Sequence, residues 1–257
     1  MAAGKLKIDI RRRQILELLG RSGQVTVCEL SAALGATGVT IRSDLDALAA
    51  SGQLQRVPGG AVLRPKRTEA PSAQIQCLAE KQAIARAVLA HIADGSTLFI
   101  NSGSTTFCAA QALEVRKRLN VVTNDLDTAR LLAGRPDVRL VLLGGEVNAD
   151  YGFTFGGDAM EQLQRYQPDW SILSVDGVDA AHGVTTYHAE EAIINRMMLE
   201  RAHRAIIAAD HRKLGRAGFT RICPLDSRFV VITDAGCPPE ILAQLRETGA
   251  EVEAAEI

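Results

Sequence analysis

The sequence predicts an α/β protein in which a small, mostly helical N-terminal domain precedes a doubly wound, mostly parallel sheet. Two observations lead to this fold class. Near the N-terminus, apolar residues recur at helical spacing, whereas farther along short, wholly apolar runs alternate with helical patterns. Strands that are apolar throughout are buried on both faces, which is typical of a parallel sheet between two layers of helices.

Composition narrows the class of protein. The chain has 257 residues, of which 47% are hydrophobic and 23% charged, so disordered and collagen-like chains are excluded. No run approaches the roughly 18 to 20 apolar residues of a membrane span. The N-terminus turns basic where a signal peptide would be apolar. The 5 cysteines form no CxxC pair, so we expect free thiols, no metal or cofactor, and a cytoplasmic location.

The charge is unevenly distributed. Residues 1–67 hold 11 Lys and Arg against 5 Asp and Glu, a balance of +6, and the other 190 hold 18 against 25, a balance of −7. A basic segment joined to an acidic one indicates that one part meets a polyanion. A merely solvated basic face is the alternative.

Three helices are expected in the basic segment. The first covers residues 9–21; the second, 26–34, begins at a candidate N-cap, Thr26; the third, 38–50, follows another, Thr37. The last two are joined by a tight turn of small residues. This arrangement is typical of a helix-turn-helix, whose second helix enters the major groove of DNA.

A hairpin is expected after these helices. Residues 53–57 and 61–63 predict strands joined by the turn 58–60, a wing on which Arg56 would meet phosphate. The alternative is a helical bundle with an exposed hairpin. We take the domain to be a winged helix-turn-helix over residues 1–63. The predicted DNA-binding residues lie on the third helix and the wing: Thr37, Thr40, Arg42, Ser43, Arg56, Gly59 and Gly60.

A polar linker, 64–75, is expected before an α/β domain over residues 76–257. Its predicted strands are the apolar runs 98–100, 121–122, 140–143, 172–175, 205–208 and 229–232. The predicted helices between and after them are 80–92, 106–113, 126–133, 159–166, 190–202 and 239–248.

Polar residues follow several of these strands, where ligands of open α/β sheets bind. Residues 101–106 supply a glycine, hydroxyls and the amides of a helix N-terminus, which suits a phosphate group, although a plain N-cap would look the same. Other polar strand ends fall at 123–125, 144–145, 176–179 and 210–213, where Lys213 would add a cation for an anionic ligand.

The stretch GATGVTIRSDLDALAASGQLQRVPGGA resembles the signature of the DeoR family of bacterial transcriptional regulators. It departs from that signature at Ala36-Thr37, where Val-Ser is usual, at Ser43, where a second Arg is usual, and at Pro58. Ser43 removes one expected contact to DNA. The motifs GSTT, VVTND, LLGG, DGVDAAHGVTT and ADHRKLG resemble the sensor domain of the same family, which is similar in fold to ribose-5-phosphate isomerase and glucosamine-6-phosphate deaminase.

The resemblance implies a transcription factor, usually a repressor, that leaves its operator DNA when a phosphorylated sugar binds. The central segments 156–169 and 177–198 are most similar to regulators of amino-sugar catabolism. An amino-sugar or hexose phosphate is therefore the expected effector. A homodimer or homotetramer is expected as well. The effector-binding residues implied by the resemblance are Ser102, Gly103, Ser104, Thr105, Thr106, Thr123, Asn124, Asp176, Asp179, Glu190, Asp210 and Lys213.

Two other functions stay open at this point. A sugar-phosphate isomerase or deaminase with an accessory DNA-binding domain would use the same acidic residues for acid–base catalysis. However, such an enzyme has no use for a winged helix-turn-helix, and neither paired metal-ligand spacing nor a GxSxG motif occurs. The third candidate is a DNA-binding protein whose second domain only oligomerises.

Overall fold

The structure is a computed structural model that describes residues 2–63 and 77–257, with side chains from residue 7 onward. Contacts divide the chain into two compact units, Met1–Lys66 and Arg67–Ile257. The predicted linker, 64–75, lies outside the described residues, so the predicted domain boundaries stay a prediction.

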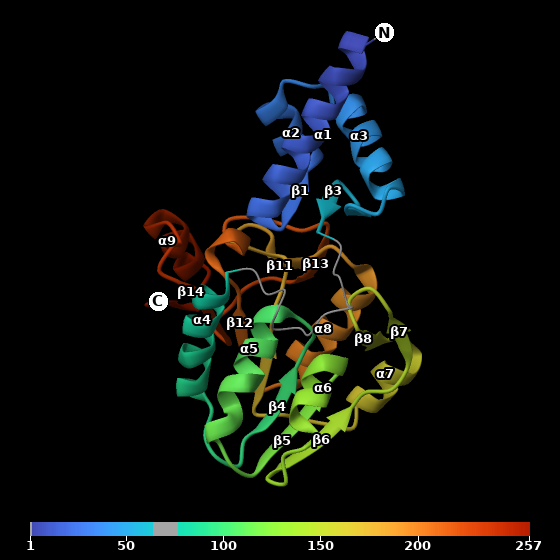
Figure 1. Cartoon of the computed structure of the whole chain (residues 1–257). Coiled ribbons are helices and arrows are strands. Elements are labelled where there is room, and N and C mark those ends of the chain that lie inside the picture. The colour runs from blue at the N-terminus through green and yellow to red at the C-terminus, as the bar shows by residue number, and fades with distance from the viewer. Residues whose placement is uncertain (1, 64–76) are drawn as a thin grey trace. The chain divides into compact units, whose positions relative to one another are not determined.

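The N-terminal unit contains the three predicted helices and a small sheet (Figure 1). The elements in chain order are α1 (Ala2–Ser22), β1 (Gln24–Thr26), α2 (Val27–Leu34), α3 (Gly38–Ala50), β2 (Gln55–Val57) and β3 (Gly60–Val62). Their core is formed by buried aliphatic side chains, among them Ile15, Leu30 and Leu45. Helix α1 begins seven residues before the predicted start because Ala, Lys and Leu there are good helix formers.

Local capping fixes where these helices begin. Thr26 caps α2 in a capping box: its hydroxyl accepts from the Glu29 amide at 3.1 Å, and the Glu29 carboxylate accepts from the Thr26 amide at 2.8 Å. Thr37 caps α3 by accepting from the Thr40 amide. Both predicted caps are confirmed. Strand β1 was not predicted; it pairs antiparallel with β3, so the wing has three strands.

A buried carboxylate joins α1 to α3. Asp44 is 2% exposed, and the guanidinium groups of Arg11 and Arg12 both donate to it, the second at 2.9 Å. Burying a charge is tolerated only when it is paired, so this cluster fixes the position of α3 against α1.

The C-terminal unit is built on a seven-stranded sheet in which every pairing is parallel. The strands in spatial order are β15 (Glu251–Ala255), β14 (Phe229–Asp234), β12 (Arg204–Ala208), β9 (Trp170–Leu173), β4 (Thr97–Ile100), β5 (Leu119–Thr123) and β6 (Val138–Leu142). The six predicted strands are confirmed. The sequence pattern missed β15 because this edge strand carries two glutamates and is not apolar throughout.

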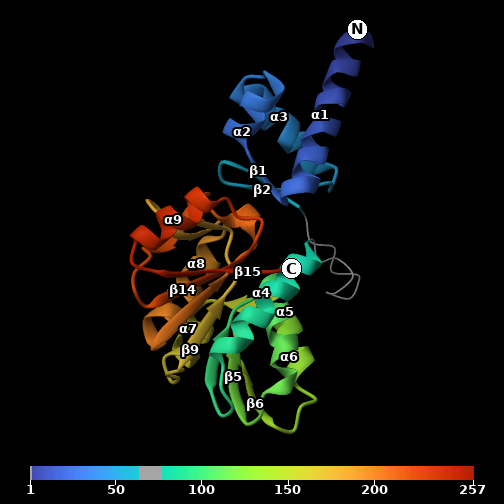
Figure 2. The ribbon, with the colours of Figure 1, turned by 90° about the vertical axis from the view of Figure 1, so that its left-hand side faces the viewer.

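Helices cover both faces of the sheet, as predicted (Figure 2). One face carries α4 (Leu78–His91), α5 (Ser104–Ala112) and α6 (Leu126–Leu132), whose apolar side chains share a core with Ile100 and Ile172. The other carries α7 (Gly157–Leu163), α8 (Ala189–Arg201) and α9 (Pro239–Glu247), packed around Phe99 and Ile207.

Smaller elements complete the unit. An antiparallel sheet joins β10 (Gly177–Asp179), β11 (Gly183–Thr186) and β13 (Thr220–Cys223), and β7 (Glu146–Asn148) pairs with β8 (Phe153–Phe155). Two short 3₁₀ helices, Leu113–Val115 and His211–Lys213, follow α5 and β12. Across residues 2–63 and 77–257, none of the helices has the length and apolar character to cross a membrane.

The order of the sheet places its topological switch point between β4 and β9. From β4 the chain adds β5 and β6 on one side, and β9, β12, β14 and β15 are added on the other. Ligands of open parallel sheets bind outside the carboxyl ends of the strands at such a point. The residues that follow β4, β9 and β12 are therefore expected to line a ligand site.

Candidate functional site

The outer face of α3 is the candidate surface for DNA. Arg42 and Ser43 are exposed there, as predicted from the sequence. Thr37 and Thr40 lie at the start of the helix, their hydroxyls 3.0 Å apart. Thr37 caps the helix and is itself exposed, Thr40 is half-buried, and Arg42 and Ser43 are accessible on the helix.

Arg56 joins the wing to α3. Its Nε donates to Asp46 at 2.8 Å, and a second guanidinium nitrogen donates to the Gly60 carbonyl. Gly59 lies at φ +79, and a Cβ on Gly60 would lie 2.0 Å from the Val25 carbonyl oxygen. The two glycines thus permit the turn and the pairing of β3 with β1, and Arg56 holds the hairpin rather than extending from it.

The loop after β4 crosses the end of β9. The Asn101 side chain exchanges two hydrogen bonds of 2.8 Å with the backbone of Ser174. Gly103 lies at φ +153, and a Cβ there would be 2.6 Å from the Ser174 Cβ. Only glycine allows the loop to pass so close to its neighbour, which explains the glycine in the predicted phosphate-binding segment.

Cations gather beside this loop. Lys81, on α4, is buried; its ammonium donates to the Ser104 hydroxyl at 2.8 Å and lies 3.9 Å from the Asp210 carboxylate. Arg212 binds the same carboxylate through Nε at 2.9 Å and Nη2 at 3.1 Å. Burial lowers the pKa of Lys81, although Asp210 opposes the shift. Burial would raise the pKa of Asp210, but Arg212 and Lys81 outweigh it and the pKa falls.

The other hydroxyls of the predicted phosphate loop are divided between structure and surface. Ser104 is exposed at the first turn of α5, whereas Thr105 and Thr106 are buried. The Thr106 hydroxyl lies 2.9 and 3.0 Å from the Asn101 and Gly103 carbonyl oxygens and donates to one of them, so it shapes the loop. Ser102 is 8% exposed. Ser104 therefore offers the accessible hydroxyl of this segment.

Thr123 and Asn124, at the end of β5, are fully buried. The Thr123 hydroxyl accepts from the Asp125 amide at 3.0 Å, and the Asn124 amide donates to the Thr154 carbonyl at 3.1 Å. The Asn124 side-chain oxygen has no hydrogen-bond partner within the described part of the chain. Both residues lie at the predicted edge, and Asn124 retains an unused acceptor there.

A pair of carboxyl groups lies on the β9 side of the switch point. Asp176 is 3.2 Å from the Lys213 ammonium, and the Thr186 hydroxyl is 2.9 Å from Asp176 and 2.7 Å from Glu191. One hydroxyl carries one proton, so it donates to one carboxyl group only. The other short contact is a hydrogen bond only when the second carboxyl group is itself protonated and donates to the Thr186 oxygen.

The electrostatics identify Glu191 as the protonated member. Burial and the nearby Asp176 raise the pKa of Glu191 to about 8. Burial would also raise the pKa of Asp176, but Lys213 and the Tyr187 amide lower it below its ordinary value. At neutral pH the cluster therefore holds a charged Asp176 paired with Lys213 and a neutral Glu191.

Replacing Glu191 with Gln should remove a pH dependence of stability. Because the folded pKa of about 8 exceeds the ordinary 4.5, the wild-type free energy of unfolding should fall as pH rises from 4.5 to 8. The expected loss is about 3–5 kcal/mol, and the variant should lack it. Urea unfolding followed by fluorescence of the one tryptophan, Trp170 on β9, measures it. Glu190→Gln, at the exposed neighbour, should retain the wild-type slope; equal slopes in wild type and Glu191→Gln would contradict the assignment.

Two predicted effector-binding residues, Asp179 and Glu190, have no contact with the group formed by Asp176, Glu191 and Lys213 among the bonds of the described residues. Asp179 caps its own turn, accepting from the Ala181 and His182 amides at 3.0 and 2.9 Å and pairing with the His182 ring. Glu190 is exposed on the first turn of α8. Since successive helical residues point about 100° apart, the neighbouring Glu191 occupies the inward position instead.

The sequence patterns missed Lys81, Arg212, Glu191 and Tyr151. The Tyr151 ring contacts the His188 ring in a tilted arrangement, with ring centres 4.7 Å apart, and burial together with Asp176 and Glu191 raises the pKa of Tyr151. Its hydroxyl is buried and has no hydrogen-bond partner among the described residues. Two of them had a detectable signal: Arg212 lies in the predicted polar strand end 210–213, and Lys81 occupies the apolar stripe of its helix, one turn before the buried Ala85.

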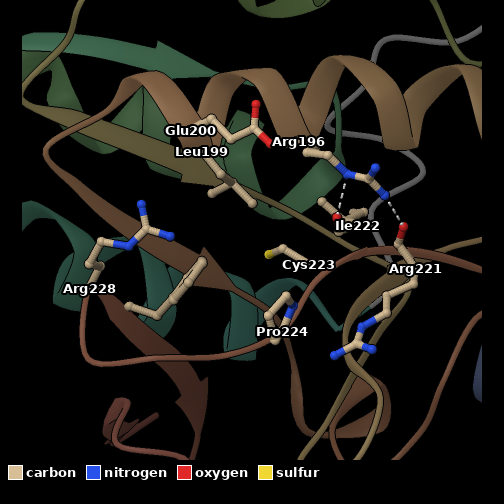
Figure 3. Close-up of a pocket in the computed structure, with 9 residues that line it drawn as sticks. Arg196, Leu199, Glu200, Arg221, Ile222, Cys223, Pro224 and Arg228 are labelled. Carbon is tan, nitrogen blue, oxygen red and sulfur yellow. Dashed lines mark hydrogen bonds between the residues drawn. The ribbon is translucent and has the colours of Figure 1, made fainter.

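A separate surface pocket of about 440 Å³ lies between α8 and the strands β13 and β14 (Figure 3). Arg196 crosses it and donates to the Ile222 and Arg221 carbonyls at 2.7 and 2.8 Å. Arg228 is paired with Asp226. The pocket is not lined by Lys81, Asp176, Glu191 or Lys213. Two of its three arginines, Arg196 and Arg228, already bond to other residues of the protein. Within the described residues, no group of His, Cys, Asp and Glu could hold a metal ion.

Family models decide the identity of both units. The DeoR-like helix-turn-helix domain matches residues 11–67, and the DeoR C-terminal sensor domain matches residues 76–235. The chain belongs to the DeoR family of transcriptional regulators. It is therefore a DNA-binding regulator with a sensor domain and not an enzyme, as the sequence motifs predicted.

Named relatives of this DeoR-family chain span nearly its whole length. A candidate aga operon transcriptional repressor of Escherichia coli O157:H7 is 34% identical, covering 94% of this chain and 92% of that protein. The glycerol-3-phosphate regulon repressor of Escherichia coli K12 is 30% identical over 96% and 99%. The repressor GlcR of Bacillus subtilis is 28% identical over 86% of each.

Solved structures also match part of the chain, at low sequence identity. A D-ribose-5-phosphate isomerase in complex with phospho-erythronic acid matches 54% of this chain and 55% of that chain, at 19% identity and a TM-score of 0.40. A match at this level supports no argument about activity. The regulatory function rests on the family models and the named relatives.

Proposed function

We propose that this DeoR-family regulator represses a sugar-catabolism operon and leaves its operator when a sugar phosphate binds at the carboxyl edge of the sensor sheet. The observation that carries the proposal is the set of cations at the switch point. Lys81, Arg212 and Lys213 come from two distant segments. Lys81 bonds Ser104 at the N-terminus of α5, Arg212 shares Asp210 with Lys81, and Lys213 pairs with Asp176. Such an arrangement suits a phosphate dianion.

The burial of Lys81 adds a second argument. Its side chain is 7% exposed, and its nearest carboxylate, Asp210, is shared with Arg212. A phosphate bound beside Ser104 would give the Lys81 ammonium a second negative partner in a site of low dielectric constant. The acidic pair and the unused Asn124 and Tyr151 groups would then face the sugar hydroxyls.

The names of the relatives support sugar catabolism as the regulated process. They refer to an aga operon, a glycerol-3-phosphate regulon and GlcR, all as repressors. We propose amino-sugar and hexose phosphates as the effector class, with the protein acting as a homodimer or homotetramer in the bacterial cytoplasm. We expect a symmetric assembly because each chain supplies one recognition helix, and an operator with two half-sites needs two.

An operator titration tests the proposal. A duplex selected by the full-length protein from a random library serves as operator, and galactosamine-6-phosphate, N-acetylgalactosamine-6-phosphate and other hexose phosphates are compared with the free sugars. Coupling of about 1–3 kcal/mol predicts that a saturating effector weakens DNA binding roughly 5- to 150-fold. Equal effects of free sugars and phosphates would contradict a phosphate site. No effect of any compound would favour a domain that only oligomerises.

The same DNA assay tests the recognition helix. Arg42→Ala should weaken binding to the selected operator by about 1–3 kcal/mol and relax the base preference at one position. Arg139→Ala, at an exposed arginine of β6, should leave affinity unchanged. If Arg42→Ala instead weakens all sequences equally and reduces the salt dependence, Arg42 contacts phosphate and not a base.

A further inference from the structure

The most exposed large apolar side chain in the described part of the chain lies on the recognition helix. Val39 is 74% exposed, compared with 67% for the C-terminal Ile257 and 65% for Phe219. It is the second residue of α3. A β-branched residue is a weaker helix former than Ala or Leu, so an exposed valine contributes little to the stability of this helix.

Val39 belongs to the face of α3 that is accessible to DNA. Positions 39, 42 and 43 follow helical spacing and are all exposed, whereas Ile41, Leu45 and Leu48 fill the core on the opposite face. A Cβ built on Gly38 would lie 3.4 Å from a guanidinium nitrogen of Arg42. The Arg42 side chain therefore runs back along the helix toward the turn that carries Val39.

The neighbouring charges also favour contact with DNA. Asp46, one turn beyond Arg42, would repel phosphate groups, but Arg56 of the wing neutralises it through a bond of 2.8 Å. The N-terminal residues of a recognition helix are those that contact base edges. In the major groove, the apolar group on those edges is the 5-methyl group of thymine.

We propose that Val39 reads the 5-methyl group of a thymine in each half-site, next to the base contacted by Arg42. The usual second Arg of the family signature is replaced here by Ser43, so this face carries one fewer charged side chain. An apolar contact supplies sequence preference without adding charge. The inference depends on DNA binding by α3 but not on the response to an effector.

Uracil substitution tests the contact, since uracil lacks only the 5-methyl group. With full-length protein and the selected operator, each thymine is replaced in turn by uracil. Loss of one buried methyl contact corresponds to about 0.8 kcal/mol, or roughly fourfold weaker binding, at one position per half-site. Wild-type binding that is unchanged by uracil at every thymine would overturn the proposal, whatever any protein variant does.

A double-mutant cycle assigns the contact to Val39. Val39→Ala should bind the thymine operator about fourfold more weakly and should lose nothing further when that thymine becomes uracil. The matched control is Val115→Ala, at a valine that is 61% exposed in the C-terminal unit, which should behave as wild type. If Val39→Ala retains the full sensitivity to uracil, another residue reads the methyl group. If Val39→Ala binds both duplexes as wild type does, the exposed valine serves another surface.

Discussion

Lys81→Met should make the regulator about 150-fold less sensitive to its phosphorylated effector, while DNA binding without effector stays at the wild-type level. Methionine keeps the unbranched, buried shape of the side chain but removes the ammonium that bonds Ser104 and lies beside Asp210. A buried charged contact to a phosphate contributes about 3 kcal/mol, which corresponds to the 150-fold change.

The measurement is the concentration of sugar phosphate that gives half-maximal release of the selected operator. Lys117→Met is the matched control, because Lys117 is an exposed lysine of the same unit and should not alter that concentration. An unchanged response of Lys81→Met would place the phosphate elsewhere on the sensor domain. Loss of DNA binding without effector would instead show that Lys81 supports the fold.

The main helices and the six predicted strands of the parallel sheet followed directly from local sequence patterns. Apolar runs such as 98–100 and 205–208 became parallel strands because a strand buried on both faces needs no polar side chain. The caps Thr26 and Thr37 were evident because a hydroxyl at this position satisfies a free amide of the helix within three residues. Such features depend on neighbours in sequence.

The site was only partly accessible to the same reasoning. The segments after β4, β9 and β12 were found because strand ends meet at one edge of a sheet. Lys81, in contrast, comes from α4, which precedes β4, the first strand of the parallel sheet in chain order. Its approach to Ser104 depends on how α4 packs against α5. The sequence analysis selected Glu190, whereas Glu191 is the buried residue, for a related reason. A shift of one position in helix phase decides which carboxyl group points inward.

Arg56 shows the same limit in the N-terminal unit. Its position on a wing predicted contact with phosphate, but pairing of the strands places it beside Asp46 and the Gly60 carbonyl. These partners lie on different elements, so no periodicity indicates them. The expected role of Arg56 at DNA stays a prediction, now beside an observed role in holding the hairpin to the recognition helix.

Asp210→Asn should produce the largest loss of stability among the site variants. Asp210 is 2% exposed, accepts bonds from the Arg212 guanidinium and from the Arg212 amide, and faces the Lys81 ammonium. Asparagine keeps the shape but leaves two cations without their carboxylate. Removing one partner of a buried ion pair costs about 3–5 kcal/mol, because the remaining charge is buried and uncompensated. Urea unfolding followed by Trp170 fluorescence measures the difference in the free energy of unfolding at neutral pH.

The fold contains its own control for this prediction. Asp226 and Arg228 repeat the Asp-x-Arg arrangement on the surface, with side chains that are 43% and 53% exposed. Asp226→Asn should therefore change stability by less than about 1 kcal/mol. The pKa of Asp210 is lowered on folding, so its contribution is complete above the unfolded value of about 3.9 and is lost as pH falls below it. The difference between wild type and Asp210→Asn should thus shrink in acid; a difference that is small at pH 7 or constant with pH would show that the carboxylate is not what holds Lys81 and Arg212 in place.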